Sequence, residues 1–193
     1  MKILATLVLA IILAVLAIIG YAYSGHYDVS AGSQHSGFAK WLLSTTSRSS
    51  IERRAAGIEA PDLSDNALIR AGANDFDAMC VGCHGAPGQK PQAMGQGLNP
   101  AAPNLSESAQ HMSPAELFWV TKNGIKMTGM PAWGATHEDD ALWPVVSLML
   151  KLPELDADRY QALLASAEGM GHHEPAATEN EIPEGHEDHD HEH

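Results

Sequence analysis

The sequence predicts an all-α protein whose folded part is a small domain of four or five short helices joined by long loops. Apolar residues recur at helical spacing in three separate stretches, and helix-start signals precede them. No stretch of useful length alternates like a strand. Composition divides the chain into residues 1–23, 24–61, 62–168 and 169–193.

Residues 1–23 have the composition of a membrane segment. The apolar run from Ile3 to Ile19 is 17 residues long and carries no charge, which is short for a membrane span and long for a signal-peptide core. Tyr21 and Tyr23 follow it, as aromatic residues do at a membrane interface. We expect a retained single-pass anchor in the cell membrane, with a cleaved signal peptide as the alternative. Both place the rest of the chain in the periplasm or otherwise outside the cytoplasm.

Residues 24–61 are predicted to form a periplasmic linker that contains short helices. Phe38, Trp41 and Leu42 share one face of a helix, and three arginines follow soon after. One interpretation is a helix on the membrane surface, with its apolar face down. The other is a stalk that packs loosely on the folded domain, and the sequence leaves both open.

The folded domain, residues 62–168, is predicted to begin with a helix. Ser64 is a good N-cap, and Asp65 would lie in the first turn, where the helix dipole favours a carboxylate. The residues that recur at helical spacing are Leu68, Ile69, Gly72, Phe76 and Met79. The helix therefore runs directly into Cys80.

The middle of the domain is predicted to hold a long loop and then a second helix. Residues 85–103 are dense in Gly, Pro and Asn, which is typical of loop. Ser113 as N-cap, Pro114 at the first position and Glu116 completing a capping box together predict a helix start. That helix should end at Gly124.

Two further helices complete the predicted domain. Thr136 to Asp139 should begin one of them by the same capping logic, and Pro144 inside it should kink or delay it. A last helix is expected from about Asp156 to Ala167, and Gly169 can end it.

Cys80, Cys83 and His84 form a C-x-x-C-H run, the spacing that attaches a c-type haem. Each thiol can form a thioether with one haem vinyl group, and the adjacent imidazole can reach the iron. A redox dithiol and half of a zinc site are the alternative interpretations. However, the chain has only these two cysteines, no paired-histidine motif lies nearby, and the flanks are predicted helical. We therefore expect one covalently bound haem c.

Met130 is the best candidate for the second axial position of the iron. A methionine thioether is a soft, neutral ligand, and together with histidine it raises the reduction potential relative to two histidines. Pro131 and nearby glycines can hold a non-helical loop against the haem edge. Met127 is the main competitor. The further alternatives are Met94, Met112, His111 and His35.

As a set, these residues resemble the class I c-type cytochromes, and most closely the single-haem domains of membrane-bound oxidase c-subunits. The resemblance covers residues 62–153 and implies a small cytochrome c fold around the haem. It implies that the Pro103 carbonyl accepts a hydrogen bond from the proximal histidine, His84, and that the loop around Met130 carries the sixth ligand. The residues for which it implies haem packing, close helix crossing or a hydrogen bond to a propionate are Gly72, Phe76, Leu105, Trp133 and Trp143.

The function implied is that of a membrane-anchored periplasmic mono-haem cytochrome c that carries single electrons between redox protein partners. Such a chain is an electron-transfer protein and not itself an enzyme. The alternative is a fixed c-type subunit of a terminal oxidase or dehydrogenase. A haem or metal sensor, or a haem enzyme, is a third interpretation. A haem enzyme requires a vacant iron position, and a metal-handling module would use the tail. Lys90, Lys122 and Lys126 would either steer an acidic partner or serve solubility alone.

Residues 169–193 are predicted to be a disordered acidic tail. The chain has a net charge of −13, and from Glu168 onward there are nine acidic residues and no lysine or arginine. No basic stripe exists elsewhere, which argues against a nucleic-acid partner. Six tail histidines are candidate ligands for a weakly bound divalent metal, with a solvated tail as the alternative. They are His172, His173, His186, His189, His191 and His193.

Overall fold

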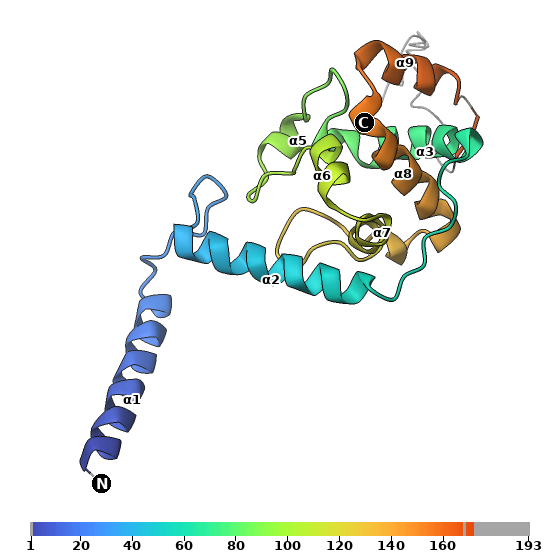
Figure 1. Cartoon of the computed structure of the whole chain (residues 1–193). Coiled ribbons are helices and arrows are strands. Elements are labelled where there is room, and N and C mark those ends of the chain that lie inside the picture. The colour runs from blue at the N-terminus through green and yellow to red at the C-terminus, as the bar shows by residue number, and fades with distance from the viewer. Residues whose placement is uncertain (1, 168, 172–193) are drawn as a thin grey trace, which may run out of the picture. The chain divides into compact units, whose positions relative to one another are not determined.

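The computed structural model describes residues 2–167 and 169–171, which form helices joined by turns and loops (Figure 1). No strand occurs among these residues, so the predicted all-α class is confirmed. The chain divides into two compact units, Met1–Thr45 and Thr46–His193.

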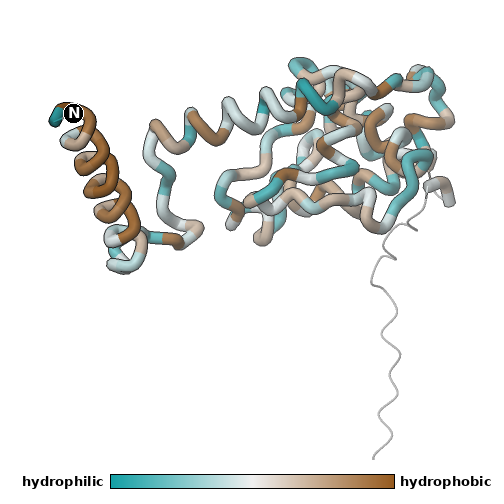
Figure 2. The backbone as a smooth tube through the Cα atoms, turned by 90° about the horizontal axis from the view of Figure 1, so that it is seen from below, coloured by the Kyte–Doolittle hydropathy of each residue, from teal (hydrophilic) through white to brown (hydrophobic). Residues whose placement is uncertain are grey.

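The first helix, α1 (Lys2–Tyr23), is 22 residues long, and its apolar side chains are exposed along its whole length. At 1.5 Å per residue it is about 33 Å long, enough to cross the hydrocarbon core of a bilayer. Figure 2 shows the apolar character running along the helix. Within the described part of the chain, it is the one helix that qualifies as a span by length and composition, a test that signal sequences also pass.

The second helix, α2 (Gly37–Ala55), is a single helix of 19 residues where short helices were predicted. It begins in the first unit and ends in the second. Near its C-terminal end Ile51 and Ala55 are buried. The first half of α2, in contrast, exposes large apolar side chains.

The second unit is built around two packed helices, α3 (Asn66–Met79) and α8 (Asp139–Lys151). Phe76 on α3 and Leu142 and Val145 on α8 are fully buried, so these helices supply much of the core. The remaining helices are α4 (Val81–His84), α5 (Ala93–Gln96), α6 (Leu105–His111), α7 (Pro114–Asn123), η1 (Trp133–Ala135), η2 (Leu152–Glu154) and α9 (Ala157–Ala165).

The two main helices touch backbone to backbone at Gly72. A Cβ at this position would lie 2.0 Å from the carbonyl oxygen of Pro144 and 2.4 Å from its carbonyl carbon. Pro144 lies inside α8, which nevertheless continues from Asp139 to Lys151. The amide that proline lacks would have bonded the carbonyl of Asp140, in the solvent-exposed first turn, where water can replace it.

The predicted start of α7 is confirmed in detail. The Ser113 hydroxyl accepts the Glu116 amide at 3.3 Å, and the Glu116 carboxylate accepts the Ser113 amide at 2.7 Å. Pro114 occupies the first helical position, and Gly124, with φ of 63°, follows the last. Each of these interactions is local, so the sequence alone specifies them.

Two other helices begin at different caps from those predicted. Asp65 rather than Ser64 caps α3, because its carboxylate accepts a first-turn amide at 2.8 Å. Glu138 rather than Thr136 precedes α8, since the Thr136 hydroxyl instead donates to the Trp133 carbonyl at 3.3 Å. In both cases neighbouring polar residues compete for the same role.

Two short helices, α5 and α6, lie in stretches for which no helix was predicted. The Asn104 side chain caps α6 by accepting the Ser106 amide at 3.0 Å. Leu105, Ala109 and Met112 pack from α6 and its C-cap against the core. Helices of this length depend on tertiary packing, which a local pattern does not report.

The last helix, α9, packs on α3. Tyr160 is fully buried, its ring lies edge-on to Phe76 with centroids 6.4 Å apart, and its hydroxyl donates to the Asp77 carboxylate at 3.2 Å. The Asn74 amide donates to the Ala167 carbonyl just beyond the end of α9 at 2.5 Å. Long-range contacts therefore fasten α9 to the first helix of the domain.

We expect Tyr160→Ala to lower the free energy of unfolding by about 3–5 kcal/mol, and Tyr160→Phe by only about 1 kcal/mol. Burial raises the pKa of Tyr160, and the nearby Asp77 carboxylate raises it further. The folded state thus favours the neutral phenol, and this stabilisation is lost as pH rises above the unfolded tyrosine pKa of about 10. Urea unfolding of the wild type at neutral pH and above pH 10 measures the alkaline loss. Tyr160→Phe should reduce that loss, and an unchanged loss would contradict the assignment.

Candidate functional site

The C-x-x-C-H run forms a single helical turn at the end of α3. Cys80 is the C-cap of α3, and its carbonyl accepts the amides of Cys83 and His84 at 3.1 and 2.9 Å. Cys80 is 6% exposed, and Cys83 and His84 are half-buried. The turn therefore holds two thiols and one imidazole in fixed relation to the core.

The orientation of His84 is set by the loop before α6. Its Nδ1 lies 2.8 Å from the carbonyl oxygen of Pro103. A carbonyl can only accept, so Nδ1 carries the proton and donates it. In a neutral ring, Nε2 is then left with a free lone pair, which is the form that binds a metal. The structure thus contains the hydrogen bond to the Pro103 carbonyl that the resemblance implies.

The burial of the Cys80 thiol argues against a redox dithiol. Burial is the main cause that raises the pKa of its thiol to about 12. A redox dithiol needs an accessible thiolate of lowered pKa. Moreover, among residues 2–167 and 169–171 no group of three or more His, Cys, Asp and Glu side chains is placed to hold a metal ion. The donor set fits a covalently held haem better than either alternative.

The loop that carries Met130 is closed by its own hydrogen bonds. The Ile125 amide donates to the Met130 carbonyl at 3.3 Å, and the Met130 amide donates to the Thr128 hydroxyl at 3.1 Å. Gly124 has φ of 63°, and a Cβ there would lie 2.7 Å from the carbonyl oxygens of Met130 and Pro131. The loop thus turns back tightly on the end of α7.

The competing axial candidates differ in burial. Met127 is 91% exposed and Met94 is 75% exposed, whereas Met130 and Met112 are half-buried. Both histidine alternatives, His111 and His35, are exposed. An apolar thioether held half-buried in a closed loop suits an axial ligand better than one in solvent, so burial favours Met130 over Met127.

Replacing Gly124 with alanine tests this loop. The new methyl group would meet the Met130 and Pro131 backbone and would also force a positive φ on a residue with a Cβ. We expect a loss of about 1–3 kcal/mol in the free energy of unfolding. The haem-loaded variant should also bind carbon monoxide after reduction more readily than the wild type. Unchanged stability and unchanged carbon monoxide binding would show that the loop tolerates the methyl group.

The aromatic residues near the site pack in two groups. Phe118 and Trp143 stack with ring centroids 3.9 Å apart and planes within 8°. Trp133 lies edge-on to the His137 ring at 5.6 Å, and its carbonyl accepts from His137 Nδ1 at 3.3 Å. Phe118 and His137 were not among the predicted site residues, because only the folded arrangement brings them to their partners.

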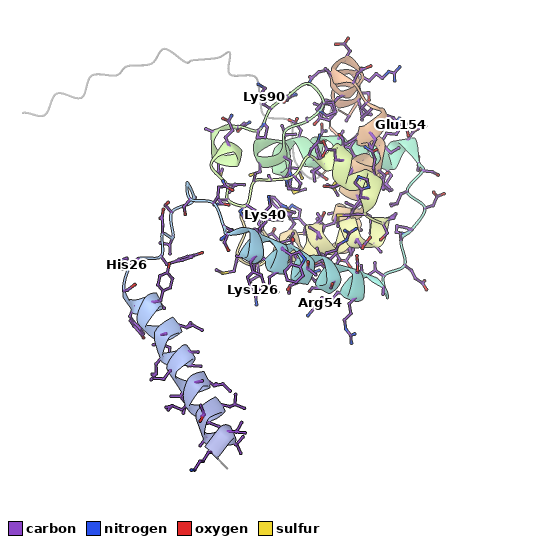
Figure 3. All side chains as sticks on the ribbon, turned by 60° about the vertical axis from the view of Figure 1, so that its left-hand side comes forward. His26, Lys40, Arg54, Lys90, Lys126 and Glu154 are labelled. Atoms are coloured by element: carbon purple, nitrogen blue, oxygen red, sulfur yellow. The ribbon has the colours of Figure 1, made fainter. Side chains whose placement is uncertain are left out.

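The other residues predicted from the resemblance lie in or against the core. Gly72 and Phe76 are buried in α3, and Leu105, Trp133 and Trp143 are half-buried against the same core cluster. Among the lysines, Lys122 is ion-paired with Asp139 at 2.5 Å and is therefore engaged within the domain. Lys90 and Lys126 are exposed (Figure 3). The six tail histidines lie outside the described residues.

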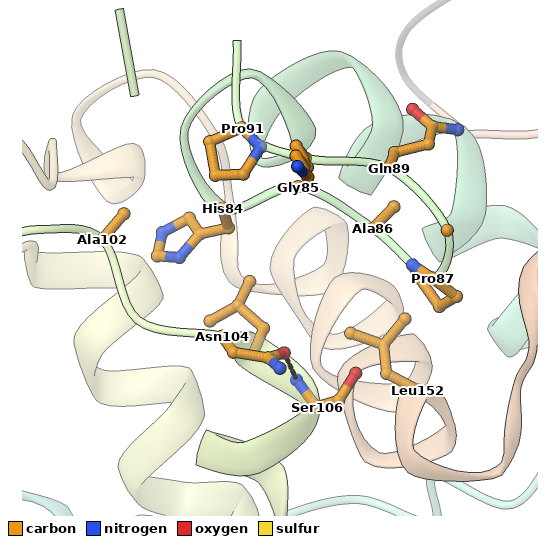
Figure 4. Close-up of a pocket in the computed structure, with 13 residues that line it drawn as sticks. His84, Gly85, Ala86, Pro87, Gln89, Pro91, Ala102, Asn104, Ser106 and Leu152 are labelled. Atoms are coloured by element: carbon orange, nitrogen blue, oxygen red, sulfur yellow. Dashed lines mark hydrogen bonds between the residues drawn. The ribbon is translucent and has the colours of Figure 1, made fainter. Parts of the chain in front are cut away.

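A hollow of about 380 Å³ lies beside His84 (Figure 4). It is bordered by the loop from Gly85 to Pro91, by Asn104 and Ser106, and by Leu152. Its lining includes His84 but neither cysteine nor Met130. The hollow therefore borders the imidazole and the loop that follows it.

Comparison with known protein families supports the resemblance to c-type cytochromes. Residues 67–149 match the sequence model of the family described as cytochrome c oxidase, cbb3-type, subunit III. The match runs from the start of α3 through most of α8, and it confirms the resemblance predicted from the motifs. No curated protein matches the chain.

Proposed function

Because residues 67–149 form a cytochrome c domain of the cbb3-type oxidase subunit III family, we propose that the chain is a membrane-anchored, periplasmic, mono-haem electron carrier. A cytochrome c domain implies a covalently bound haem c and redox partners. The observation that carries the proposal is the His84–Pro103 hydrogen bond beside two thiols at haem-attachment spacing. In this proposal α1 is retained as the anchor, residues 24–61 connect it to the domain, and residues 62–168 form the haem domain.

Each site residue has a distinct task in this proposal. Cys80 and Cys83 would hold the haem through thioethers, and His84 through Nε2 and Met130 through its thioether would be the protein's ligands to the iron. The haem supplies a one-electron couple between Fe(III) and Fe(II). The Pro103 carbonyl keeps the imidazole in one tautomer and orientation, and Trp133 packs beside the Met130 loop or donates its indole N–H to a propionate. Fixed ligands keep the structural change on electron transfer small.

A carbon monoxide difference spectrum of the reduced, haem-loaded chain tests the carrier function. If both axial positions are held by the protein, carbon monoxide should cause no spectral change. Rapid binding of one carbon monoxide per haem would show an open or labile position. That result would contradict the proposed electron-carrier function and would favour a haem sensor or haem enzyme.

A second candidate is a fixed c-type subunit of a terminal oxidase or dehydrogenase, which the family's description as an oxidase subunit favours. Native membranes dissolved in a mild detergent separate the two. A free carrier should migrate alone, at the mass of one chain plus detergent. A stable subunit should co-purify with other polypeptides and their cofactors. Mass spectrometry of the same sample shows whether α1 is retained in the mature chain.

Docking to donor and acceptor is expected to be brief, through a small interface around the exposed haem edge. Lys90 and Lys126 are exposed cations that would steer a partner with an acidic patch. The association rate should therefore fall as ionic strength rises.

The histidines of the tail are proposed to bind a divalent metal ion weakly. The proposal rests on sequence composition, in which six imidazoles alternate with carboxylates between positions 172 and 193. Titration with Ni²⁺ or Cu²⁺ of the full chain and of a chain ending at Gly171 should show heat of binding only for the former. Equal heats would contradict the proposal.

A further inference from the structure

The first half of α2 presents an exposed apolar face. Phe38, Trp41 and Leu42 are 70%, 60% and 45% exposed. At 100° per residue they occupy an arc of about 100° around the helix axis, and the rings of Phe38 and Trp41 lie 5.9 Å apart. We call this surface the aromatic face of α2.

The buried side of α2 lies in another direction. Ile51 follows Phe38 by thirteen residues, which turns it about 140° around the axis. Ile51 and Ala55 are buried, so the buried side of the second half of the helix differs from the aromatic face. The aromatic face does not continue into that buried side.

The chain places this face close to a bilayer if α1 crosses it. Thirteen residues, 24–36, separate the end of α1 from the start of α2, and they span at most about 45 Å when fully extended. Exposed Tyr21, Tyr23 and Tyr27 mark the end of α1 and the segment after it. Aromatic side chains of this kind favour the layer between headgroups and hydrocarbon.

The charge on α2 also suits a membrane surface. The helix carries four basic residues and one acidic residue, in a chain whose net charge is −13. The Arg48 guanidinium and the Glu52 carboxylate pair at 3.2 Å, so most of the basic charge is uncompensated within the helix. Basic residues near an anionic bilayer are attracted to it, whereas the rest of this acidic chain is repelled.

We propose that the aromatic face of α2 lies in the interfacial layer of the same membrane that α1 crosses. This inference rests on the proposed retention of α1. Since the second half of α2 belongs to the same compact unit as the haem domain, a helix seated on lipid would hold that domain at the surface in a limited range of orientations. The connection between anchor and domain would then act as a positioning element and not as a free tether.

Lipid quenching in nanodiscs tests the proposal with the full, haem-loaded chain. A single cysteine at Thr45→Cys, on the aromatic face, or at Lys40→Cys, on the far side, is labelled with bimane. Cys80 and Cys83 do not react because their sulfurs are in thioethers. Nanodiscs of phosphatidylcholine and phosphatidylglycerol carry a nitroxide lipid labelled near the headgroup. We expect quenching at position 45 to exceed that at position 40 by about threefold, and to weaken without phosphatidylglycerol.

Two variants with serine substitutions supply the decisive comparison. In the Thr45→Cys background, Phe38→Ser with Trp41→Ser should reduce quenching to the level seen at position 40. Leu43→Ser removes an exposed apolar side chain from another side of α2 and should change little. Equal quenching at positions 45 and 40, or quenching that survives the double substitution, would overturn the proposal. A chain that elutes apart from the nanodiscs would instead overturn the anchor, and this inference with it.

Discussion

Gly72→Ala should lower the free energy of unfolding of the haem domain by about 3 kcal/mol. The added Cβ would lie 2.0 Å from the Pro144 carbonyl oxygen, and the obstacle is backbone inside a helix. No rotamer change relieves such a contact, so α3 and α8 must move apart. The fully buried side chains of the two helices then lose packing contacts with one another. Urea unfolding of the haem-loaded variant, followed by far-UV circular dichroism, measures the loss.

Gly97→Ala is the matched control for this substitution. A Cβ at Gly97 would meet nothing closer than the Met94 carbonyl oxygen at 3.6 Å, and the residue has an ordinary φ of −87°. Its effect on the unfolding free energy should stay within about 0.5 kcal/mol. If both variants unfold at the same urea concentration as the wild type, the close crossing at Gly72 does not exist in solution.

Met130→Ala should allow the reduced haem to bind one carbon monoxide, whereas the wild-type haem should bind none. The substitution removes the proposed thioether ligand and leaves only His84 on the iron. The reduction potential should also fall, because methionine stabilises the reduced iron relative to harder ligands. Difference spectra and a redox titration report the two effects separately, and far-UV circular dichroism checks that the fold is retained.

Two other methionines serve as controls for the axial assignment. Met127→Ala removes a side chain that is 91% exposed and should change neither readout. Met112→Ala removes a half-buried side chain that packs against the core, so it should reduce stability without opening the iron to carbon monoxide. Stoichiometric binding by the Met112 variant, with none by the Met130 variant, would move the axial ligand to Met112.

The sequence predicts local features of this fold better than features that depend on distant contacts. The capping box of Ser113 and Glu116 joins residues three apart, so a pattern is sufficient to find it. Helix α6 was missed because its apolar residues are few and its place depends on packing against the core. The predicted N-caps of α3 and α8 lie one and two residues before the observed N-caps. At both helix starts several neighbouring polar side chains compete for the N-cap position.

The residues of the site also divide into those that a local motif predicts and those that depend on distant contacts. The residues proposed to attach the haem and to bind its iron from the proximal side, Cys80, Cys83 and His84, form one short motif and are visible in the sequence. The stack of Phe118 on Trp143 joins residues 25 positions apart, and no spacing rule predicts it. The resemblance implied a bond between His84 and Pro103, and the structure contains that bond at 2.8 Å.

The buried position of Cys80 bears on the order in which the molecule is assembled. In the folded domain Cys80 is 6% exposed, and burial raises the pKa of its thiol to about 12. In the proposed haem protein, its sulfur would therefore be joined to the cofactor more readily before the domain has folded than after. The chain would then reach the attachment step unfolded, and folding of the domain would follow the covalent step.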